Sequence, residues 1–360
     1  MANSPFSRRH FIGAVAGAAA VANLHPLQSF ANSSTEEKKA PAGPIKIICT
    51  SNFSLQEQEK IKSVAKNIDL QVVPDPSSPA LEEAEAIIGD VNGSVLQRAK
   101  NLKWVQVLHA GVENMPKEMK THPLVLTNMQ KVFAPVIAES AIALLLSLTR
   151  GMVQFAMPNF NQKKWMGSPP SDIKLDDLYN KTIGIVGMGG IGSETARRLH
   201  HGFNMHVLAT DAKPLHKPDF VDELHDPSWL MEMVPKVDVL MSAAPLTKET
   251  REMFNEEVFS KMNPNSYFIN VSRGGLVKQD ALIDALKSKK IRGAGLDVAT
   301  PEPLPADNPL WSCPNLIITA HNSTQAPVRY ERMFGQVLEN VRRFSLGLPL
   351  MNVVDKEKGY

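Results

Sequence analysis

One short stretch, residues 182–199, limits the possible fold of this chain more than any other. Its first five residues, Thr182–Val186, form a β-branched, apolar run that is typical of a strand buried on both faces. A glycine-rich turn follows directly, and then a run of good helix formers. Free N–H groups at the start of such a helix, together with the helix dipole, favour a bound pyrophosphate. The turn has the spacing of a dinucleotide-binding loop, with glycines at Gly187, Gly189 and Gly192.

Asp211 adds a second, independent signal. It ends the next apolar run, residues 206–210, and lies nineteen residues after Gly192. An acidic side chain at that place accepts hydrogen bonds from the adenosine ribose hydroxyls and repels a 2′-phosphate. The sequence therefore predicts an NAD site in preference to an NADP site, although Lys213 introduces a cation two residues on.

The first residues have the pattern of an export signal. The pair Arg8-Arg9 precedes an Ala/Val/Gly-rich run to about Ala22, and a small-x-small site closes at Ala31. These features are those of a twin-arginine signal peptide over residues 1–31, which predicts a periplasmic or otherwise exported protein. The alternative is a cytoplasmic protein with a basic amino-terminal tail. Residues 32–44 are polar and aperiodic and indicate a linker.

Charge and cysteine content exclude several classes of protein. The chain has 39 basic and 37 acidic residues, and removal of residues 1–31 leaves 37 of each. No basic patch indicates nucleic acid, and no basic amphipathic face indicates a membrane surface, so we expect neither nucleic-acid binding nor stable membrane insertion. Cys49 and Cys313 make neither a disulfide framework nor a metal-binding spacing, so we expect two inert, buried thiols and no metal site; a single bridge between them is the alternative.

Apolar runs alternate with helical patterns twice along the chain. The first series has strands at 45–50, 70–73, 86–89 and 104–109. The second extends from 182 to 321, with strands near 182–187, 205–210, 237–242, 267–271, 293–297 and 315–319. This order predicts an α/β fold with two Rossmann-like or flavodoxin-like domains, each a doubly wound parallel sheet. We expect a substrate-binding domain built from residues 45–126 and 323–360, and a Rossmann domain over residues 127–322.

A long helix is predicted over Val136–Arg150. Its middle, Ala141–Leu148, is apolar on nearly every side, so it must be buried between domains or between subunits. We expect a homodimer built largely on this helix, because a continuous apolar surface is rarely left in water.

Three charged or titratable residues follow strands of the second series. Arg273 follows Phe268–Ser272, Glu302 follows Gly295–Val298 across a short turn, and His321 ends the run from Leu316. Open parallel sheets bind ligands at the carboxyl ends of their strands. Each residue alone has a structural explanation, but three at one sheet edge predict an active site.

The chain at this point resembles the D-isomer-specific 2-hydroxyacid dehydrogenases over nearly all of residues 45–360. The motifs that carry the resemblance are Gly187–Gly192, Pro245–Thr250, Asn270–Gly275, Gly295–Pro305 and Ile317–His321. The resemblance implies that Arg273, Glu302 and His321 are catalytic. It also implies that the backbone of Ala110, Gly111 and Val112, with Arg273 and His321, binds substrate. The implied cofactor-binding residues are Gly187, Gly189, Gly190, Ile191, Gly192, Asp211, Pro245, Thr250, Val271, Arg273 and Asp297, with Asp297 near the nicotinamide amide.

These residue types suit the implied chemistry. An arginine fork binds a carboxylate through paired, charge-assisted hydrogen bonds. A protonated histidine donates to the oxygen on which negative charge develops, and a neighbouring carboxylate stabilises its charged form. We therefore expect an NAD-dependent oxidoreductase acting on a small D-2-hydroxy or 2-oxo acid of the glyoxylate, hydroxypyruvate or pyruvate type. The alternative is a non-catalytic NAD-sensing protein of the same fold.

One loop departs from the family pattern, and the role of one histidine is open. Ala320 and Asn322–Thr324 surround His321 where the family carries a Pro-His-x-Ala-Gly pattern, so the loop that faces the cofactor is expected to differ. His109, beside the predicted carboxylate loop, has two open roles, as a substrate contact or as a buried structural residue.

Overall fold

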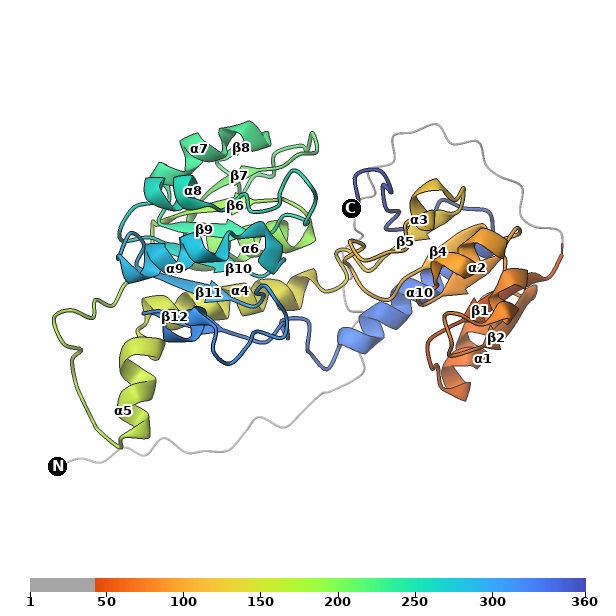
Figure 1. Cartoon of the computed structure of the whole chain (residues 1–360), viewed down its shortest axis with the longest axis horizontal. Coiled ribbons are helices and arrows are strands. Elements are labelled where there is room, and N and C mark those ends of the chain that lie inside the picture. The colour runs from red at the N-terminus through yellow and green to blue at the C-terminus, as the bar shows by residue number, and fades with distance from the viewer. Residues whose placement is uncertain (1–42) are drawn as a thin grey trace, which may run out of the picture. The chain divides into compact units, whose positions relative to one another are not determined.

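The computed structural model describes residues 43–360, which contain two separate parallel sheets (Figure 1). The predicted signal peptide and nearly all of the predicted linker lie outside the described residues. The first sheet has five strands in the order β2-β1-β3-β4-β5. Its strands are β1 Ile45–Cys49, β2 Ile68–Val72, β3 Ala86–Ile88, β4 Trp104–Gln106 and β5 Val125–Thr127.

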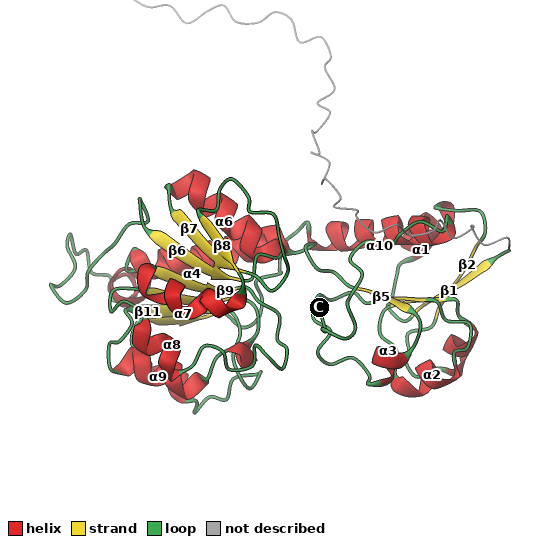
Figure 2. Cartoon of the chain, turned by 90° about the horizontal axis from the view of Figure 1, so that it is seen from above, coloured by secondary structure: helices red, strands yellow, loops and turns green. Residues whose placement is uncertain are grey.

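Helices cover both faces of this sheet. Figure 2 shows α1 (Leu55–Ser63) and α10 (Arg329–Ser345) on one side of the strands and α2 (Gly93–Arg98) and α3 (Glu118–Thr121) on the other. The last helix, α10, comes from the far end of the chain, and the ring centroid of its Phe344 lies 5.1 Å from that of Trp104 in β4. The carboxyl-terminal segment therefore packs with the first sheet and completes its core.

The second sheet has seven strands in the order β12-β11-β10-β9-β6-β7-β8. All of its pairings are parallel, and its central strands are buried on both faces, which is why they appear in the sequence as unbroken apolar runs. The strands are β6 Thr182–Val186, β7 His206–Thr210, β8 Glu223–His225, β9 Val239–Ser242, β10 Tyr267–Asn270, β11 Gly293–Leu296 and β12 Leu316–Ile318. The predicted α/β fold class is confirmed.

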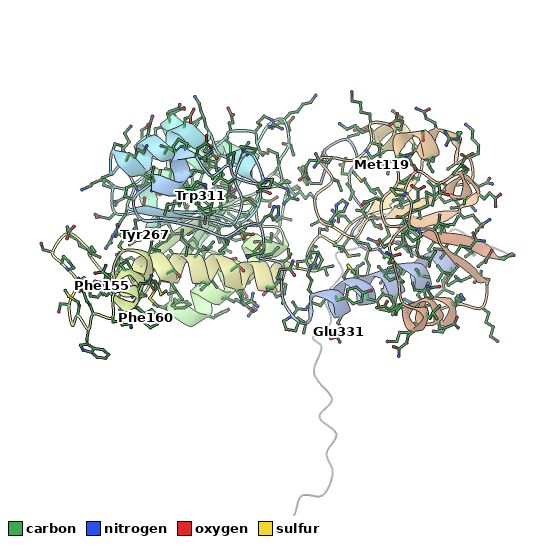
Figure 3. The ribbon with its side chains drawn as sticks, turned by 60° about the horizontal axis from the view of Figure 1, so that its bottom comes forward. Met119, Phe155, Phe160, Tyr267, Trp311 and Glu331 are labelled. Atoms are coloured by element: carbon green, nitrogen blue, oxygen red, sulfur yellow. The ribbon has the colours of Figure 1, made fainter. Side chains whose placement is uncertain are left out.

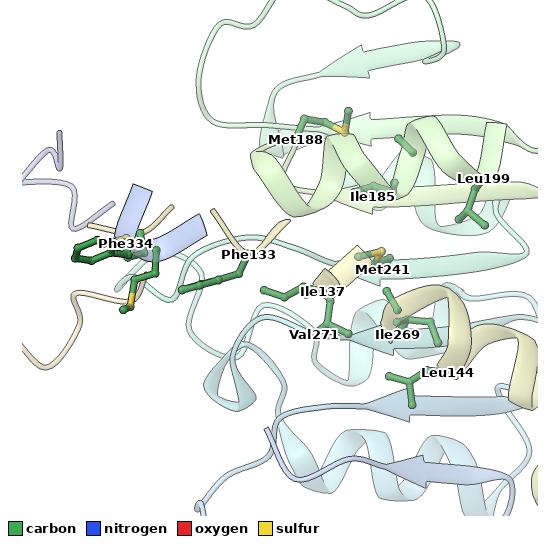
Figure 4. Packing of buried hydrophobic residues seen from close by; sticks show 14 of the residues in the cluster. Phe133, Ile137, Leu144, Ile185, Met188, Leu199, Met241, Ile269, Val271 and Phe334 are labelled. Atoms are coloured by element: carbon green, nitrogen blue, oxygen red, sulfur yellow. The ribbon is translucent and has the colours of Figure 1, made fainter. Parts of the chain in front are cut away.

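The long apolar helix α4 (Ala134–Thr149) lies against this second sheet. It packs on α6 (Gly190–Phe203) and on β10 and β11, and Ile137 and Leu144 face the sheet residues Ile269 and Val271 (Figure 4). Ala141, Leu144, Leu145 and Leu148 are buried inside the chain itself, whereas Ile142 and Leu146 are half-buried and Ala143 is exposed. The subunit interface expected on this helix stays a prediction. The opposite face of the sheet is covered by α7 Leu230–Met233, α8 Glu256–Lys261 and α9 Gln279–Lys287.

The segment after α4 is exposed and rich in large apolar side chains. Gly151, with φ +66°, ends the helix and leads into the π-helix η2 (Met152–Ala156) and α5 (Met157–Asn161). Phe160 is 74% exposed and Trp165 is fully exposed, and Figure 3 shows Phe155 and Phe160 on this segment. Among residues 43–360 no single helix is long and apolar enough to cross a membrane; the bent pair Ala134–Thr149 and Met152–Asn161 passes the same test by length and composition.

Two strands were missed by the sequence analysis. β5 and β8 have three residues each, and β8 is a sheet-edge strand with the sequence Glu-Leu-His, which carries no apolar run. Both are defined by pairing with a neighbour, so their own sequence contains little signal. The remaining short helices are η1 Pro79–Glu83, η3 Pro227–Trp229, η4 Val234–Lys236, η5 Gly274–Leu276 and η6 Pro309–Ser312.

The two cysteines are free thiols in different surroundings. Cys49 is buried in the core of the first sheet, and burial raises the pKa of its thiol to about 12, which makes it unreactive at neutral pH. Cys313 is only half-buried, so the expectation that both are buried is wrong for this one.

Candidate active site

The glycine-rich turn lies between β6 and α6, as the sequence predicts. Gly187 has φ +99°, a conformation that favours glycine, and Gly189 precedes the helix without any side-chain cap. A Cβ added to Gly189 would have no heavy atom within 4 Å, so open space lies against the first turn of α6. A Cβ on Gly192 would instead overlap the carbonyl oxygen of Gly187, which explains the need for glycine where the helix packs on the turn.

Asp211 follows β7 and holds this turn in place. Its Oδ2 accepts a hydrogen bond of 2.7 Å from the backbone N–H of Met188, and its Oδ1 accepts one of 2.7 Å from the N–H of Lys213. The Lys213 ammonium lies over the ring of Tyr360, 4.6 Å from its centroid. The open space at Gly189, the uncapped helix and the acidic residue at the end of β7 fit a dinucleotide, which Gly187–Gly192 and Asp211 would hold.

The other predicted cofactor residues lie in the loops that follow β9 and β10 and at the end of β11. Thr250 donates from Oγ1 to the carbonyl of Pro245 at 2.7 Å, which closes the loop after β9. Val271 is buried directly after β10.

Asp297, at the end of β11, is hydrogen-bonded to the loop that carries His321. Its buried carboxylate accepts hydrogen bonds from Thr319 Oγ1 at 2.6 Å, Asn322 N at 3.1 Å and Ser323 N at 3.2 Å. These three hydrogen bonds fix the loop that carries His321 to the end of β11.

His321 and Glu302 form a hydrogen-bonded pair. The Nδ1 atom of His321 lies 2.7 Å from Glu302 Oε2, and Glu302 Oε1 accepts a hydrogen bond of 2.9 Å from the N–H of Ala299. The bond to Ala299 orients the carboxylate toward the imidazole ring. Nε2 of His321 has no hydrogen-bond partner among residues 43–360. His321 has φ +50°, an uncommon backbone conformation that the bonds from its N–H to the carbonyls of Asp297 and Thr319 maintain.

Arg273 lies on a neighbouring loop. It follows the buried Asn270, whose amide donates to the carbonyl of Arg273 at 2.9 Å and whose Oδ1 accepts from Ser272. A Cβ on Gly274 would overlap the carbonyl oxygen of Ala299, so the loop that carries Arg273 packs directly on the loop that carries Glu302. The three predicted catalytic residues are therefore placed on adjoining loops at one edge of the sheet.

The predicted substrate loop, Ala110–Val112, lies beside Arg273. A Cβ on Gly111 would overlap Nη2 of Arg273, so the guanidinium lies against the backbone of this glycine. Asn128 donates to the carbonyl of Ala110 at 2.6 Å and supports the loop. The side chain of His109 is 48% exposed, so this histidine is not a buried residue. Its Nδ1 lies 2.6 Å from the carbonyl oxygen of Gly111, and its Nε2 lies 3.1 Å from Oδ1 of Asp90.

Sequence reasoning missed one charged residue in this region. Glu113 Oε1 accepts a hydrogen bond of 2.5 Å from Nε of Arg273, although the two residues are 160 positions apart. Its position two residues after Gly111 was the available signal. In the part of the chain that the structure describes, no group of three or more His, Cys, Asp or Glu side chains could hold a metal ion.

Comparisons with known proteins agree with this geometry. The family described as "D-isomer specific 2-hydroxyacid dehydrogenase, NAD binding domain" matches residues 142–323. A glyoxylate/hydroxypyruvate reductase B from Pectobacterium carotovorum is 34% identical over 269 residues, which cover 73% of this chain and 83% of the relative.

Two solved structures are similar over most of the chain. A D-isomer specific 2-hydroxyacid dehydrogenase from Xanthobacter autotrophicus, in complex with NADPH and MES, is 25% identical with a TM-score of 0.72, over 89% of this chain and 100% of that one. An NADPH-dependent glyoxylate/hydroxypyruvate reductase from Sinorhizobium meliloti, in complex with NADP and malonate, is 25% identical with a TM-score of 0.70, over 88% and 98%. The chain therefore belongs to the D-isomer-specific 2-hydroxyacid dehydrogenase family and is an NAD(P)-dependent oxidoreductase of that family.

Proposed function

We propose that this protein transfers a hydride between NAD(H) and a small 2-oxo or D-2-hydroxy acid of the glyoxylate, hydroxypyruvate or pyruvate type. The observation that carries the proposal is the His321–Glu302 pair, 2.7 Å apart, on a loop next to the one that carries Arg273. The relatives named glyoxylate/hydroxypyruvate reductase support the same substrate class.

Each side chain has one part in this proposal. Arg273 and the Gly111 backbone bind the substrate carboxylate, because a guanidinium offers several N–H donors in one plane. His321 donates a proton from Nε2 to the carbonyl oxygen during reduction and takes it back during oxidation. Glu302 orients the ring through Nδ1 and stabilises its charged form. The nicotinamide supplies the hydride, and the loops after β9, β10 and β11 surround the place it would take.

Cofactor choice is proposed to favour NAD. Asp211 places a carboxylate at the ribose end of the site, where a 2′-phosphate would be repelled. Lys213 lies beside it but is directed at the ring of Tyr360. The relatives from Xanthobacter autotrophicus and Sinorhizobium meliloti were solved with NADPH or NADP, so this proposal distinguishes the present chain from them.

The test is a panel of 2-oxo acids assayed with NADH and with NADPH, followed by the absorbance of the reduced cofactor. Turnover of glyoxylate, hydroxypyruvate or pyruvate with a higher kcat/KM for NADH is expected. Cofactor binding without turnover of any 2-oxo acid would favour the NAD-sensing alternative, and a higher kcat/KM with NADPH would refute the cofactor proposal.

A homodimer is also proposed, built on the part of α4 that is not buried and on the segment that follows it. The apolar side chains exposed after α4 form a continuous segment of the chain, and surfaces of this kind usually meet a partner. Exposed members of this surface, here called the arm, are Met152, Met157, Phe160, Trp165 and Met166. A second copy of the chain would cover them, and light scattering tests this directly.

Export by the twin-arginine route is proposed from residues 1–31. Because that route carries folded proteins, we expect NAD to be bound before export and released slowly. Cell fractionation, followed by a scan of the purified protein for bound nicotinamide, tests both statements. Uncleaved protein found only in the cytoplasm would refute export, and cofactor-free exported protein would refute retention.

A further inference from the structure

Glu113 is an acidic side chain placed directly on the arginine that is proposed to bind substrate. Arg273 Nε donates to Glu113 Oε1 at 2.5 Å, and the two side chains are 28% and 29% exposed. Burial alone would raise the pKa of the Glu113 carboxyl, but the charge and hydrogen bond of Arg273 outweigh it and hold this pKa below its usual value. Glu113 is therefore ionised at neutral pH.

The rest of the guanidinium is also partly engaged. Nη1 donates to the carbonyl of Ser272 at 2.7 Å, and Nη2 lies against the backbone of Gly111. A guanidinium has five N–H donors, so a substrate carboxylate can share it with Glu113 through donors that these contacts leave over. The shared arginine, however, then faces two carboxylates with a single positive charge.

On the loops described above a third carboxylate meets no lysine or arginine besides Arg273; of the two histidines there, His109 already lies 3.1 Å from Asp90 and His321 serves the carbonyl oxygen. Asp90, the partner of His109, adds further negative charge on the side of the first sheet. Once one substrate carboxylate shares Arg273 with Glu113, one negative charge is in excess, and a second negative group on the substrate would be repelled by it. A substrate with one carboxylate and an otherwise neutral body would not.

We propose that Glu113 is a specificity-determining residue that restricts the site to 2-oxo acids with a single carboxylate. This inference rests on the proposed function, since it assigns Arg273 to the substrate carboxylate. It adds a statement about substrate class that neither the catalytic pair nor the glycine-rich turn implies: dicarboxylic 2-oxo acids are rejected by charge rather than by size.

Two probes of nearly equal size test the charge directly. Oxamate carries one negative charge and oxalate carries two, and neither is reduced, so calorimetric titration of the NADH-loaded protein measures binding without turnover. Glu113→Gln should tighten oxalate relative to oxamate by about fivefold or more, because two unit charges 4 Å apart repel by ~1 kcal/mol even in bulk water. Glu113→Asp keeps the charge and should keep the discrimination of the wild type.

Glu118→Gln is the matched control. Glu118 begins α3, which covers the same first sheet, and its Oε1 accepts a hydrogen bond of 3.1 Å from Gln97 Nε2. This substitution therefore makes the same change in net charge away from Arg273. It should leave the oxalate-to-oxamate ratio unchanged. An oxalate-to-oxamate ratio that is equal in Glu113→Gln and wild type would overturn the inference. Weaker binding of both probes by Glu113→Gln would also overturn it, because it would show that Glu113 only positions Arg273.

Kinetic assays separate this inference from the proposed function. In Glu113→Gln, kcat/KM for oxaloacetate should rise relative to that for glyoxylate by a similar factor. If no 2-oxo acid is turned over but the probes are still discriminated by Glu113, the proposed function fails and the charge selection stands. If wild type and variants bind neither probe, the carboxylate site itself is refuted, and the inference with it.

Discussion

Two glycines of the same turn should fail in opposite ways when each is replaced by alanine. A Cβ on Gly192 would overlap the carbonyl oxygen of Gly187 and lie 3.1 Å from its carbon, so the strand and helix must move apart. A Cβ on Gly189 meets nothing within 4 Å, and the φ of −65° at this residue is open to alanine. Gly192→Ala should therefore damage the fold, and Gly189→Ala should damage only cofactor binding.

The magnitudes follow from these contacts. Overpacking in a rigid interior costs about 1–3 kcal/mol, which in a domain of this size corresponds to a fall in Tm of roughly 2–10 °C. Gly189→Ala should leave the Tm of the cofactor-free protein unchanged or raise it slightly, because alanine restricts the unfolded chain. Its methyl group would occupy the space proposed for the pyrophosphate, and loss of one hydrogen bond to a charged group costs about 1.5–3 kcal/mol. The Kd for NADH should accordingly rise about 10- to 150-fold.

Thermal unfolding of the cofactor-free protein and NADH binding by fluorescence measure the two effects separately. Gly202→Ala, near the end of the same helix α6, is the control, because a Cβ there also meets nothing within 4 Å and lies far from the turn along the helix. It should keep the NADH affinity of the wild type. Equal losses of Tm in Gly189→Ala and Gly192→Ala, or full NADH affinity in Gly189→Ala, would refute the assignment of separate roles.

Three further outcomes are expected. His321→Ala should lower kcat by about 10²–10⁴-fold with NADH binding retained, the usual range for loss of a general acid–base group; a comparable loss of NADH binding would show a structural role instead. Glu302→Gln removes the carboxylate oxygen that lies 2.7 Å from Nδ1 and orients the ring, so it should lower kcat while NADH affinity is retained; an unchanged kcat would mean that the two residues do not interact in catalysis. Trp165→Ser removes a fully exposed ring from the arm and should weaken the proposed dimer, measured by light scattering at micromolar concentration, whereas a wild type that is already monomeric would exclude the dimer.

Local motifs in the sequence were sufficient to predict the fold class and the cofactor-binding turn. The glycine spacing and the buried strand before it are short-range features that reflect backbone requirements within a few residues, and Asp211 stands at a fixed spacing after the next strand. Strands buried on both faces can also be recognised in the sequence as unbroken apolar runs. The short strands β5 and β8 do not, because their conformation depends on a neighbouring strand.

The three predicted catalytic residues were found because they share a simple rule of position. Each follows a strand of one parallel sheet, and all such strands end at the same edge. The rule places the residues at that edge without giving their contacts. Only packing shows that Gly274 touches Ala299, that Glu302 is aimed by the N–H of Ala299, and that Asp297 accepts three hydrogen bonds from the loop around His321.

Contacts between residues far apart in sequence were decided by the tertiary structure alone. The sequence predicts that α4 is buried, since it is apolar on nearly every side, but it does not say what covers it. One side of the helix packs on the sheet of the same chain, and its half-buried side and the exposed arm after it remain for a partner. Glu113 and Arg273 are separated by 160 positions, so no periodicity or spacing connects them. Their meeting depends on where two loops from two sheets are placed, and it sets the charge that an incoming substrate would encounter.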